Sequence, residues 1–291
     1  MTRMEARIGR TPTARVAHRQ GALRAIIASA APVTVRRAFY MGLGASIYPK
    51  SETGYGLAIE DSNVLRDQGD AGYEAIIDPT RIVREADMWS SPAEAARYYA
   101  RQLRLDPWDD MPCRLAVTCE SDGLALALFG HLSDTPYRIV AVRGNGSSSA
   151  VASLADWLAD APDAAFVLHV GDADGQGLAI EADLASRLAL HARRLGTLTP
   201  VVERVWLSVD QAIAYGLPSR PAKLTPMDRK YGFVAECWEA EAGDPALIAG
   251  LIRTRAAEIV DADVLAEVSV RERIARAAFA TLADTLTEAT A

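Results

Sequence analysis

The stretch that most constrains the fold of this chain is residues 167–177 (VLHVGDADGQG), where an apolar run ends in two carboxylates. A short apolar run of this kind is typical of a buried parallel strand. Asp172 and Asp174 are two positions apart, so their side chains point to the same side of an extended backbone. Two such carboxylates repel each other and lose hydration, and a bound Mg²⁺ relieves both effects. The alternative is a solvated Asp-x-Asp-Gly turn.

A second apolar run, residues 113–119 (CRLAVTC), is also followed by an acid, Glu120, and then by a helical pattern. This arrangement resembles a Toprim domain, in which a glutamate after the first strand and an Asp-x-Asp after a later strand share Mg²⁺. By that resemblance Glu120, Asp172 and Asp174 are the metal ligands. Residues 137–142 predict a further strand. The carboxyl ends of parallel strands are where α/β sheets place their sites.

Composition narrows the class of protein. A chain of 291 residues, half of them hydrophobic, is long enough for one large or two ordinary domains. No apolar run reaches membrane-spanning length, and the arginine-rich N-terminus lacks the apolar stretch of a signal peptide. The three cysteines lack zinc-site spacing and indicate a reducing compartment. We therefore expect a cytoplasmic, nucleoid-associated protein without a membrane partner.

The charge of the chain is unevenly distributed. The net charge is −7, but residues 1–40 hold eight arginines and one acid, a local +7 that leaves −14 on the remainder. A basic arm on an acidic body supplies phosphate contacts locally. The alternative is a solvated tail, which we favour for residues 1–14. No G-x-x-x-x-G-K-[ST] motif occurs, so nothing indicates ATP binding by a P-loop.

The pattern along the chain divides it into three parts. Residues 1–19 are expected to be a flexible basic tail. Residues 20–105 carry three helical patterns and a short extended piece, which fits a winged-helix-like DNA-binding module, with Thr34 as the N-cap of its second helix. Residues 106–291 are expected to form a Toprim-like parallel-sheet domain that ends in helices. The predicted fold class is therefore α/β, and its expected helices are residues 21–31, 35–43, 54–66, 178–195, 210–215, 245–260 and 264–286.

Several short motifs extend the resemblance. Residues 33–40 (VTVRRAFY) are similar to the T-[LV]-R-x-x-[FY]-Y stretch of the family that contains topoisomerase VI A subunits and meiotic double-strand-break transesterases, which has small phage and plasmid members. Residues 47–55 resemble its I-P-K-T-E-x-x-Y and residues 78–81 its D-x-T-R. Matching segments follow in the family's order as far as about residue 265, including Lys223 and residues 236–242, which resemble V-E-L-D-A-L.

The resemblance implies a mechanism. Tyr40 is then the nucleophile that attacks a DNA phosphodiester and stores the bond as a phosphotyrosine. Its ordinary pKa near 10 requires a nearby cation, and Arg36 and Arg37 share its helix face at i−4 and i−3. The resemblance also implies double-stranded DNA as substrate, Mg²⁺ as cofactor, a homodimer and a separate GHKL-type ATPase subunit. The expected activity is that of a type IIB topoisomerase A subunit.

Arg66, Arg81 and Arg143 are the expected DNA contacts, because phosphate contacts position a protein on DNA. Two positions differ from the family: Ser121 follows Glu120 where relatives have lysine, and Gly175 follows the Asp-x-Asp where relatives have proline. The expected recognition region, residues 56–64, is also poor in Lys and Arg and contains two acids.

Two alternatives remain open at this stage. One is a Toprim nuclease in which metal-activated water attacks the phosphodiester and Tyr40 only packs against its neighbours. The other is a non-catalytic DNA-binding homologue.

Overall fold

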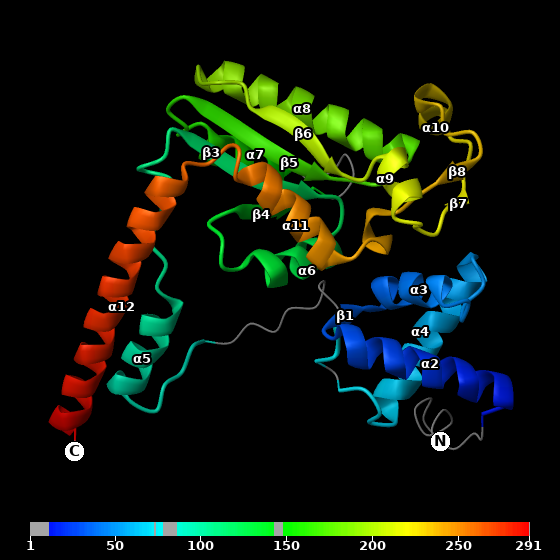
Figure 1. Ribbon diagram of the computed structural model, residues 1–291, viewed down its shortest axis with the longest axis horizontal. Helices are drawn as coiled ribbons and strands as arrows, with labels where there is room; N and C mark the ends of the chain where they lie inside the picture. Colours follow the sequence, from blue (N-terminus) through cyan, green and yellow to red (C-terminus); the bar gives the residue numbers. More distant parts are fainter. Residues whose placement is uncertain (1–11, 73, 78–85, 143–147, 291) are drawn as a thin grey trace.

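A four-stranded parallel sheet forms the centre of the molecule (Figure 1). The computed structural model describes residues 12–72, 74–77, 86–142 and 148–290. The strand order is β4-β3-β5-β6, and every neighbouring pair is parallel, which confirms the α/β class. The strands are β3 (Cys113–Cys119), β4 (Arg138–Ala141), β5 (Ala164–Val170) and β6 (Val201–Trp206).

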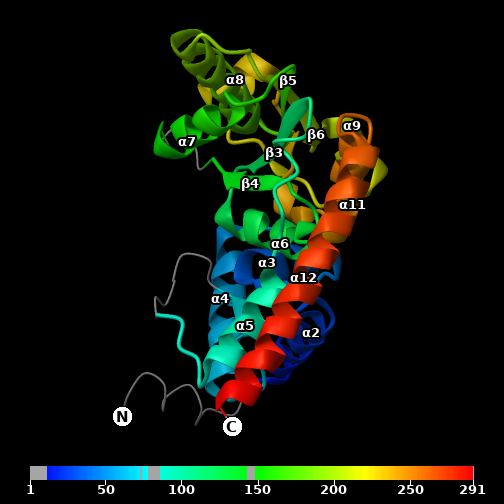
Figure 2. The same cartoon turned by 90° about the vertical axis from the view of Figure 1, so that its left-hand side faces the viewer.

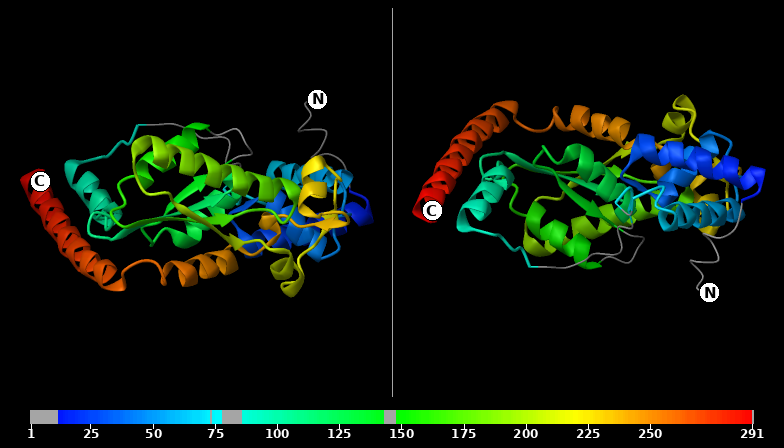
Figure 3. Two further views of the ribbon diagram at one scale, coloured as in Figure 1. Left: turned by 90° about the horizontal axis from the view of Figure 1, so that it is seen from above. Right: turned by 90° about the horizontal axis from the view of Figure 1, so that it is seen from below.

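Helices cover both faces of this sheet, as the two views in Figure 3 show. One face packs against α6 (Asp122–Leu132) and α11 (Pro245–Ala256), and the other against α7 (Ser148–Leu158) and α8 (Gly175–Leu195). The side chains of β5 alternate accordingly, with Leu168 on the first face and Val167 on the second. Alternation between two apolar layers makes the whole strand hydrophobic in sequence.

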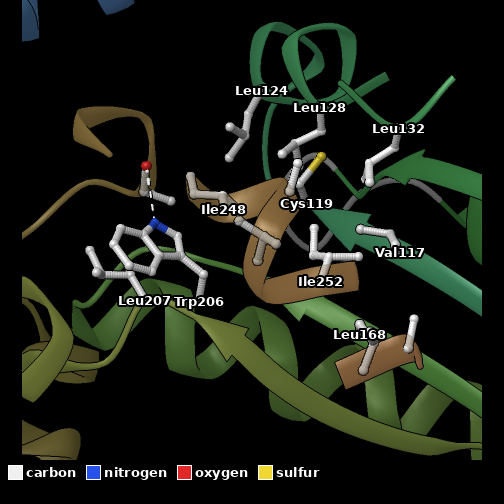
Figure 4. Close-up of a cluster of buried hydrophobic side chains, with 14 of the residues drawn as sticks. Val117, Cys119, Leu124, Leu128, Leu132, Leu168, Trp206, Leu207, Ile248 and Ile252 are labelled. Atoms are coloured by element: carbon white, nitrogen blue, oxygen red, sulfur yellow. Dashed lines mark hydrogen bonds between the residues drawn. The ribbon is translucent and has the colours of Figure 1, made fainter. Parts of the chain in front are cut away.

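The larger apolar layer closes the gap between the sheet and α6 and α11 (Figure 4). Leu128 on α6 and Ile252 on α11 are fully buried there. Trp206 at the end of β6 is also fully buried, and its indole Nε1 donates to the carbonyl oxygen of Ala240 at 3.3 Å. This hydrogen bond joins the sheet to the short helix η2 (Ala240–Ala242).

The N-terminal part is a three-helix unit that lies beside the carboxyl ends of the strands. Thr34 caps the second helix by accepting from the backbone N–H of Arg37 at 3.2 Å, and Ser51 caps the third in the same way from Gly54 at 3.1 Å. The strands β1 and β2 pair in parallel. A wing is an antiparallel pair, so β1 and β2 do not provide one, and the winged-helix assignment stays a prediction. The unit contains α2 (Ala14–Ala30), β1 (Val33–Thr34), α3 (Val35–Gly44), α4 (Glu52–Asp67) and β2 (Ile76–Ile77).

The expected basic tail ends earlier than its sequence indicated, because α2 begins at Ala14. Arg19, which we expected in the tail, forms an ion pair with Asp61. Asp61 is buried and also accepts from the hydroxyl of Tyr48 at 3.2 Å. This acid of the expected recognition region therefore holds the helical unit together rather than facing outward.

Helices α5 (Pro92–Gln102) and α12 (Ala262–Thr290) lie side by side away from the sheet (Figures 1 and 2). Arg276 on α12 donates to the carbonyl oxygen of Leu103 at 2.8 Å, and Arg104 pairs with Glu272 at 3.1 Å. The segment that we expected at the end of the N-terminal module thus packs against the C-terminal helix.

Short elements complete the chain between β6 and α11. They are α9 (Val209–Ala214), β7 (Arg220–Pro221), α10 (Pro226–Tyr231) and β8 (Glu236–Cys237), with β7 and β8 antiparallel. Within the described residues, no helix combines the length and apolar character needed to cross a bilayer.

Candidate functional site

The strand order reverses between β3 and β5, whose carboxyl ends lie side by side. The chain passes from β3 outward to β4 and then returns across β3 to β5. Such a switch point is where open α/β sheets hold ligands. Glu120 follows β3 and Asp172 follows β5, and the backbone N–H of Asp172 donates to Glu120 Oε1 at 2.9 Å. The structure therefore brings together the two acid-ended strands that the sequence indicated.

Asp172 and Asp174 have different surroundings. Asp172 Oδ1 accepts from the backbone N–H of Ala240 at 2.7 Å. Asp174 is the N-cap of α8, accepting from the N–H of Gly177 at 2.7 Å, and its other oxygen accepts from Arg220 at 2.5 Å. Both oxygens of Asp174 are thus bound by the protein itself.

A further acid, Glu239, joins this group. Glu239 lies within hydrogen-bonding reach of Asp172. It accepts from Arg36 at 2.5 Å and from Arg220 Nε at 2.7 Å. Burial works against its ionisation, but Arg36 and Arg220 together hold the pKa of Glu239 below its usual value. Glu239 is therefore the carboxylate that connects α3, β7 and the Asp172 loop.

Burial dominates the electrostatics of the other two acids. It raises the pKa of Glu120 to about 7, and the charges of Asp174 and Glu239 act in the same direction. It also raises the pKa of Asp172 well above its ordinary value, assisted by Glu239 and Glu120. Like charges in a region of low dielectric disfavour one another's ionised forms.

Tyr40, the predicted nucleophile, lies half-buried on α3 next to this group. Burial and the charge of Glu239 raise the pKa of Tyr40 above its ordinary value, and Arg36, which hydrogen-bonds the hydroxyl, opposes them. Arg36 thus acts in the direction that we expected, but burial outweighs it and the hydroxyl is a neutral phenol.

Arg37 does not take the role that its helical spacing indicated. Its guanidinium donates to the carbonyl oxygen of Gly243 at 2.5 Å and to Asp244 at 3.2 Å. These contacts attach α3 to the loop that precedes α11. Positions i−3 and i−4 share a helix face, but here the two arginines bind different partners on that face.

A cleft of about 450 Å³ opens beside Tyr40, between the N-terminal unit and the β7 segment. Lys50, Arg220 and Lys223 line it together with Tyr40 and the aromatic ring of Tyr55. Lys50 donates to the hydroxyl of Ser219 at 3.0 Å. The cleft also contains two acids, Glu52 and Glu239, but its cations outnumber them. Cations next to a phenol hydroxyl suit a phosphate group.

The expected DNA contacts have different outcomes. Arg66 donates to the backbone carbonyl of Ile76 and lies partly buried, so it serves the N-terminal unit rather than an outer surface. Arg81 and Arg143 lie outside the described residues.

Ser121 and Gly175, the two positions that differ from the resembled motif, each have a structural role. The hydroxyl of Ser121 caps α6, accepting from Leu124 N–H at 3.1 Å, and donates to Glu241. At Gly175 a Cβ would overlap the backbone of Met227 and Asp228, so the close approach of α10 requires glycine.

The three predicted metal ligands do not fit a metal ion as they are arranged. Over the part of the chain that the structure describes, no group of three or more acidic, histidine or cysteine side chains is placed to hold one. Asp174 is the main reason, since its oxygens bind Gly177 and Arg220. The positive charge that a divalent cation would supply comes here from Arg36 and Arg220.

Sequence reasoning missed the role of Glu239, Arg220 and Arg204. Arg204 on β6 donates to the carbonyl oxygens of Gly171 and Asp172 at 2.9 and 3.1 Å and so holds the acidic loop in place. The available signal was the segment of residues 236–242, which resembles V-E-L-D-A-L and contains three acids. Comparison with family models, with curated proteins and with solved structures finds no match to this chain.

Proposed function

We propose that this chain is a DNA transesterase of the type IIB topoisomerase A-subunit kind, acting on double-stranded DNA through Tyr40. The observation that carries the proposal is the continuous set of contacts from the Tyr40 hydroxyl through Arg36 and Glu239 to Asp172, beside a cation-lined cleft. The parallel sheet with acids at its switch point supports a Toprim-like domain. A double-strand break needs two tyrosines, so we propose a homodimer as the acting form.

The proposed chemistry uses the chain's own groups. The Tyr40 oxygen attacks the phosphorus, the bond from phosphorus to one sugar oxygen breaks, and that oxygen leaves as a hydroxyl by taking a proton from water. The hydroxide left by that water is neutralised by the proton that Tyr40 gives to Glu239. The phenol proton passes to the Glu239 carboxylate once Arg36 turns from Glu239 to the incoming phosphate. The phosphotyrosine keeps the bond energy, so the reverse reaction reseals the strand. The magnesium implied by the resemblance does not fit the present arrangement, and no step is assigned to it.

A non-catalytic DNA-binding homologue is the second candidate. It is favoured by the raised pKa of Tyr40 and by the arginines that already neutralise Asp174 and Glu239. In this protein the same contacts would fix the N-terminal unit on the sheet and serve no reaction.

The deciding experiment incubates supercoiled DNA with wild type, with Tyr40→Phe and with Tyr99→Phe, whose ring is half exposed on α5. Each reaction runs with and without Mg²⁺ and with a GHKL-type ATPase partner, and is stopped with denaturant. Linear DNA that enters a gel only after protease treatment, from wild type and Tyr99→Phe but not from Tyr40→Phe, supports the transesterase. Cutting that needs no protease and survives Tyr40→Phe indicates a nuclease. DNA binding without any cutting selects the second candidate.

A further inference from the structure

A second cleft, of about 660 Å³, lies at the opposite end of the sheet from Tyr40. Its lining includes Arg138, the first residue of β4, and Trp108, which precedes β3. Glu120 follows the other end of β3, about 23 Å from the start of that strand at ~3.3 Å per residue. The two clefts share no lining residue and are therefore separate sites.

Cations dominate the lining of this second cleft. Arg101, Arg104 and Arg138 all contribute to it, and all three side chains are exposed. Arg104 pairs with Glu272 at 3.1 Å and is still 57% exposed. The one acid of the lining, Asp106, accepts from the backbone N–H of Trp108 at 2.9 Å. On a chain of net charge −7, this is a local positive surface that favours anions.

Three aromatic side chains, Trp108, Phe129 and Trp157, also line this cleft. The guanidinium carbons of Arg138 and Arg114 lie 4.7 and 5.1 Å from the ring centre of Trp157, and Trp157 meets Trp108 edge to face at 5.6 Å. Phe129 on α6 also lines the cleft and is 57% exposed, a large apolar ring facing water. Flat rings beside arginines suit ligands that combine planar bases with phosphates.

We propose that this second cleft binds single-stranded nucleic acid. Arginine forks match phosphate oxygens, while the exposed ring of Phe129 offers a face on which an unpaired base stacks. A duplex presents only phosphates to such a cleft and leaves the rings unused. The volume lies within the usual range for ligand sites of about 300–1,000 Å³. The proposal does not rest on the chemistry of Tyr40.

The test measures fluorescence anisotropy of a labelled twelve-nucleotide oligothymidylate with the full chain between 50 and 200 mM NaCl. Arg104→Gln combined with Arg138→Gln is expected to weaken binding at least tenfold at 100 mM NaCl and to reduce the salt slope by about 1.4, since each of the two phosphate contacts contributes about 0.7. Phe129→Ala is expected to weaken binding at least fivefold, because stacking on one base is worth about 1–3 kcal/mol. Arg193→Gln, an exposed change on α8, is the control, and circular dichroism checks the fold of each variant.

Three outcomes would overturn the proposal. The first is wild type that does not bind the oligonucleotide, or whose binding survives the double arginine change. The second is a twelve-base-pair duplex that binds as tightly as the single strand. The third is inorganic polyphosphate that competes equally while Phe129→Ala has no effect, which would mean an anion site without base recognition. Tyr40→Phe should bind the oligonucleotide like wild type, so failure of the transesterase proposal leaves this result readable.

Discussion

Replacing Arg220 by glutamine tests the balance of charge at the candidate site. Arg220 binds Asp174 at 2.5 Å and Glu239 at 2.7 Å, and those two carboxylates are 9% and 10% exposed. Arg220→Gln keeps much of the side chain's volume but removes the cation that both acids share. Glu239 then keeps only Arg36, and Asp174 loses the arginine that pairs with it.

The expected loss is about 3 kcal/mol in the free energy of unfolding. Breaking a buried ion pair by removing one partner costs about 3–5 kcal/mol. Arg220 itself is 23% exposed, so water reaches the pair and the lower end of that range applies. The loss is large against a total stability of about 5–15 kcal/mol for a folded protein.

Urea unfolding in the presence of EDTA measures this loss. Arg253→Gln is the matched control, because its pair with Asp134 has the same 2.5 Å separation but side chains that are 41% and 65% exposed; its cost should stay below about 1 kcal/mol. If Arg220→Gln unfolds within about 0.5 kcal/mol of wild type, the inference that arginines neutralise the acidic group is wrong.

Magnesium should then act differently on the two proteins. With Arg220 absent, the acids have lost a cation, so 10 mM Mg²⁺ is expected to restore about 1–1.5 kcal/mol to the variant, the gain for a Kd of about 1 mM. Wild type should gain much less. Equal gains in both proteins would show that the cation acts elsewhere.

Two further predictions concern stability. Burial lowers the pKa of His169 to about 3 from 6.5. As the pH falls, the unfolded chain therefore takes up this proton before the folded chain does. The contribution of neutral His169 to the free energy of unfolding is fully present above pH 6.5 and falls by about 1.4 kcal/mol per pH unit toward pH 3. Urea unfolding at pH 7 and pH 5 should show this loss of unfolding free energy in wild type and in His131→Gln. In His169→Gln the loss should be smaller by about 2 kcal/mol. An equal loss in all three proteins would refute the assignment to His169. Gly54→Ala should lower the free energy of unfolding by about 1–3 kcal/mol, because the added Cβ would overlap the carbonyl oxygen of Pro49. Gly56→Ala on the same helix meets open space and should raise the free energy of unfolding by about 0.5–1 kcal/mol. A thermal melt that ranks the two variants the other way would contradict the packing at Gly54.

Local signals explain which elements the sequence predicted. The strand at residues 113–119 and the helix after Thr34 have the expected bounds within one or two residues, because apolar period and a capping hydroxyl act over a few positions. The pairing of α5 with α12 was not predictable in this way. Its contacts join segments more than 150 residues apart, and no short-range pattern records them.

The candidate site shows the same division. The sequence placed Glu120 and Asp172 at adjacent strand ends, and the structure joins them directly. It did not indicate that Asp174 would cap α8 and bind Arg220, because Arg220 lies 46 residues further along the chain. Arg66 was expected to contact DNA because of its charge. Its partner, the carbonyl oxygen of Ile76, could not be predicted from that charge, because the contact depends on how the chain folds between the two residues.

The pairing of α5 with α12 also determines when α5 can be packed during synthesis of the protein. Helix α5 leaves the ribosome long before α12, whose last turns include residue 290. Chains grow at about 5–20 residues per second, so α5 waits on the order of ten seconds for its partner. During that interval its apolar side, including the alanines buried at 93, 96 and 100, is open to other chains. A ribosome that stops before residue 262 would leave that helix permanently without its partner.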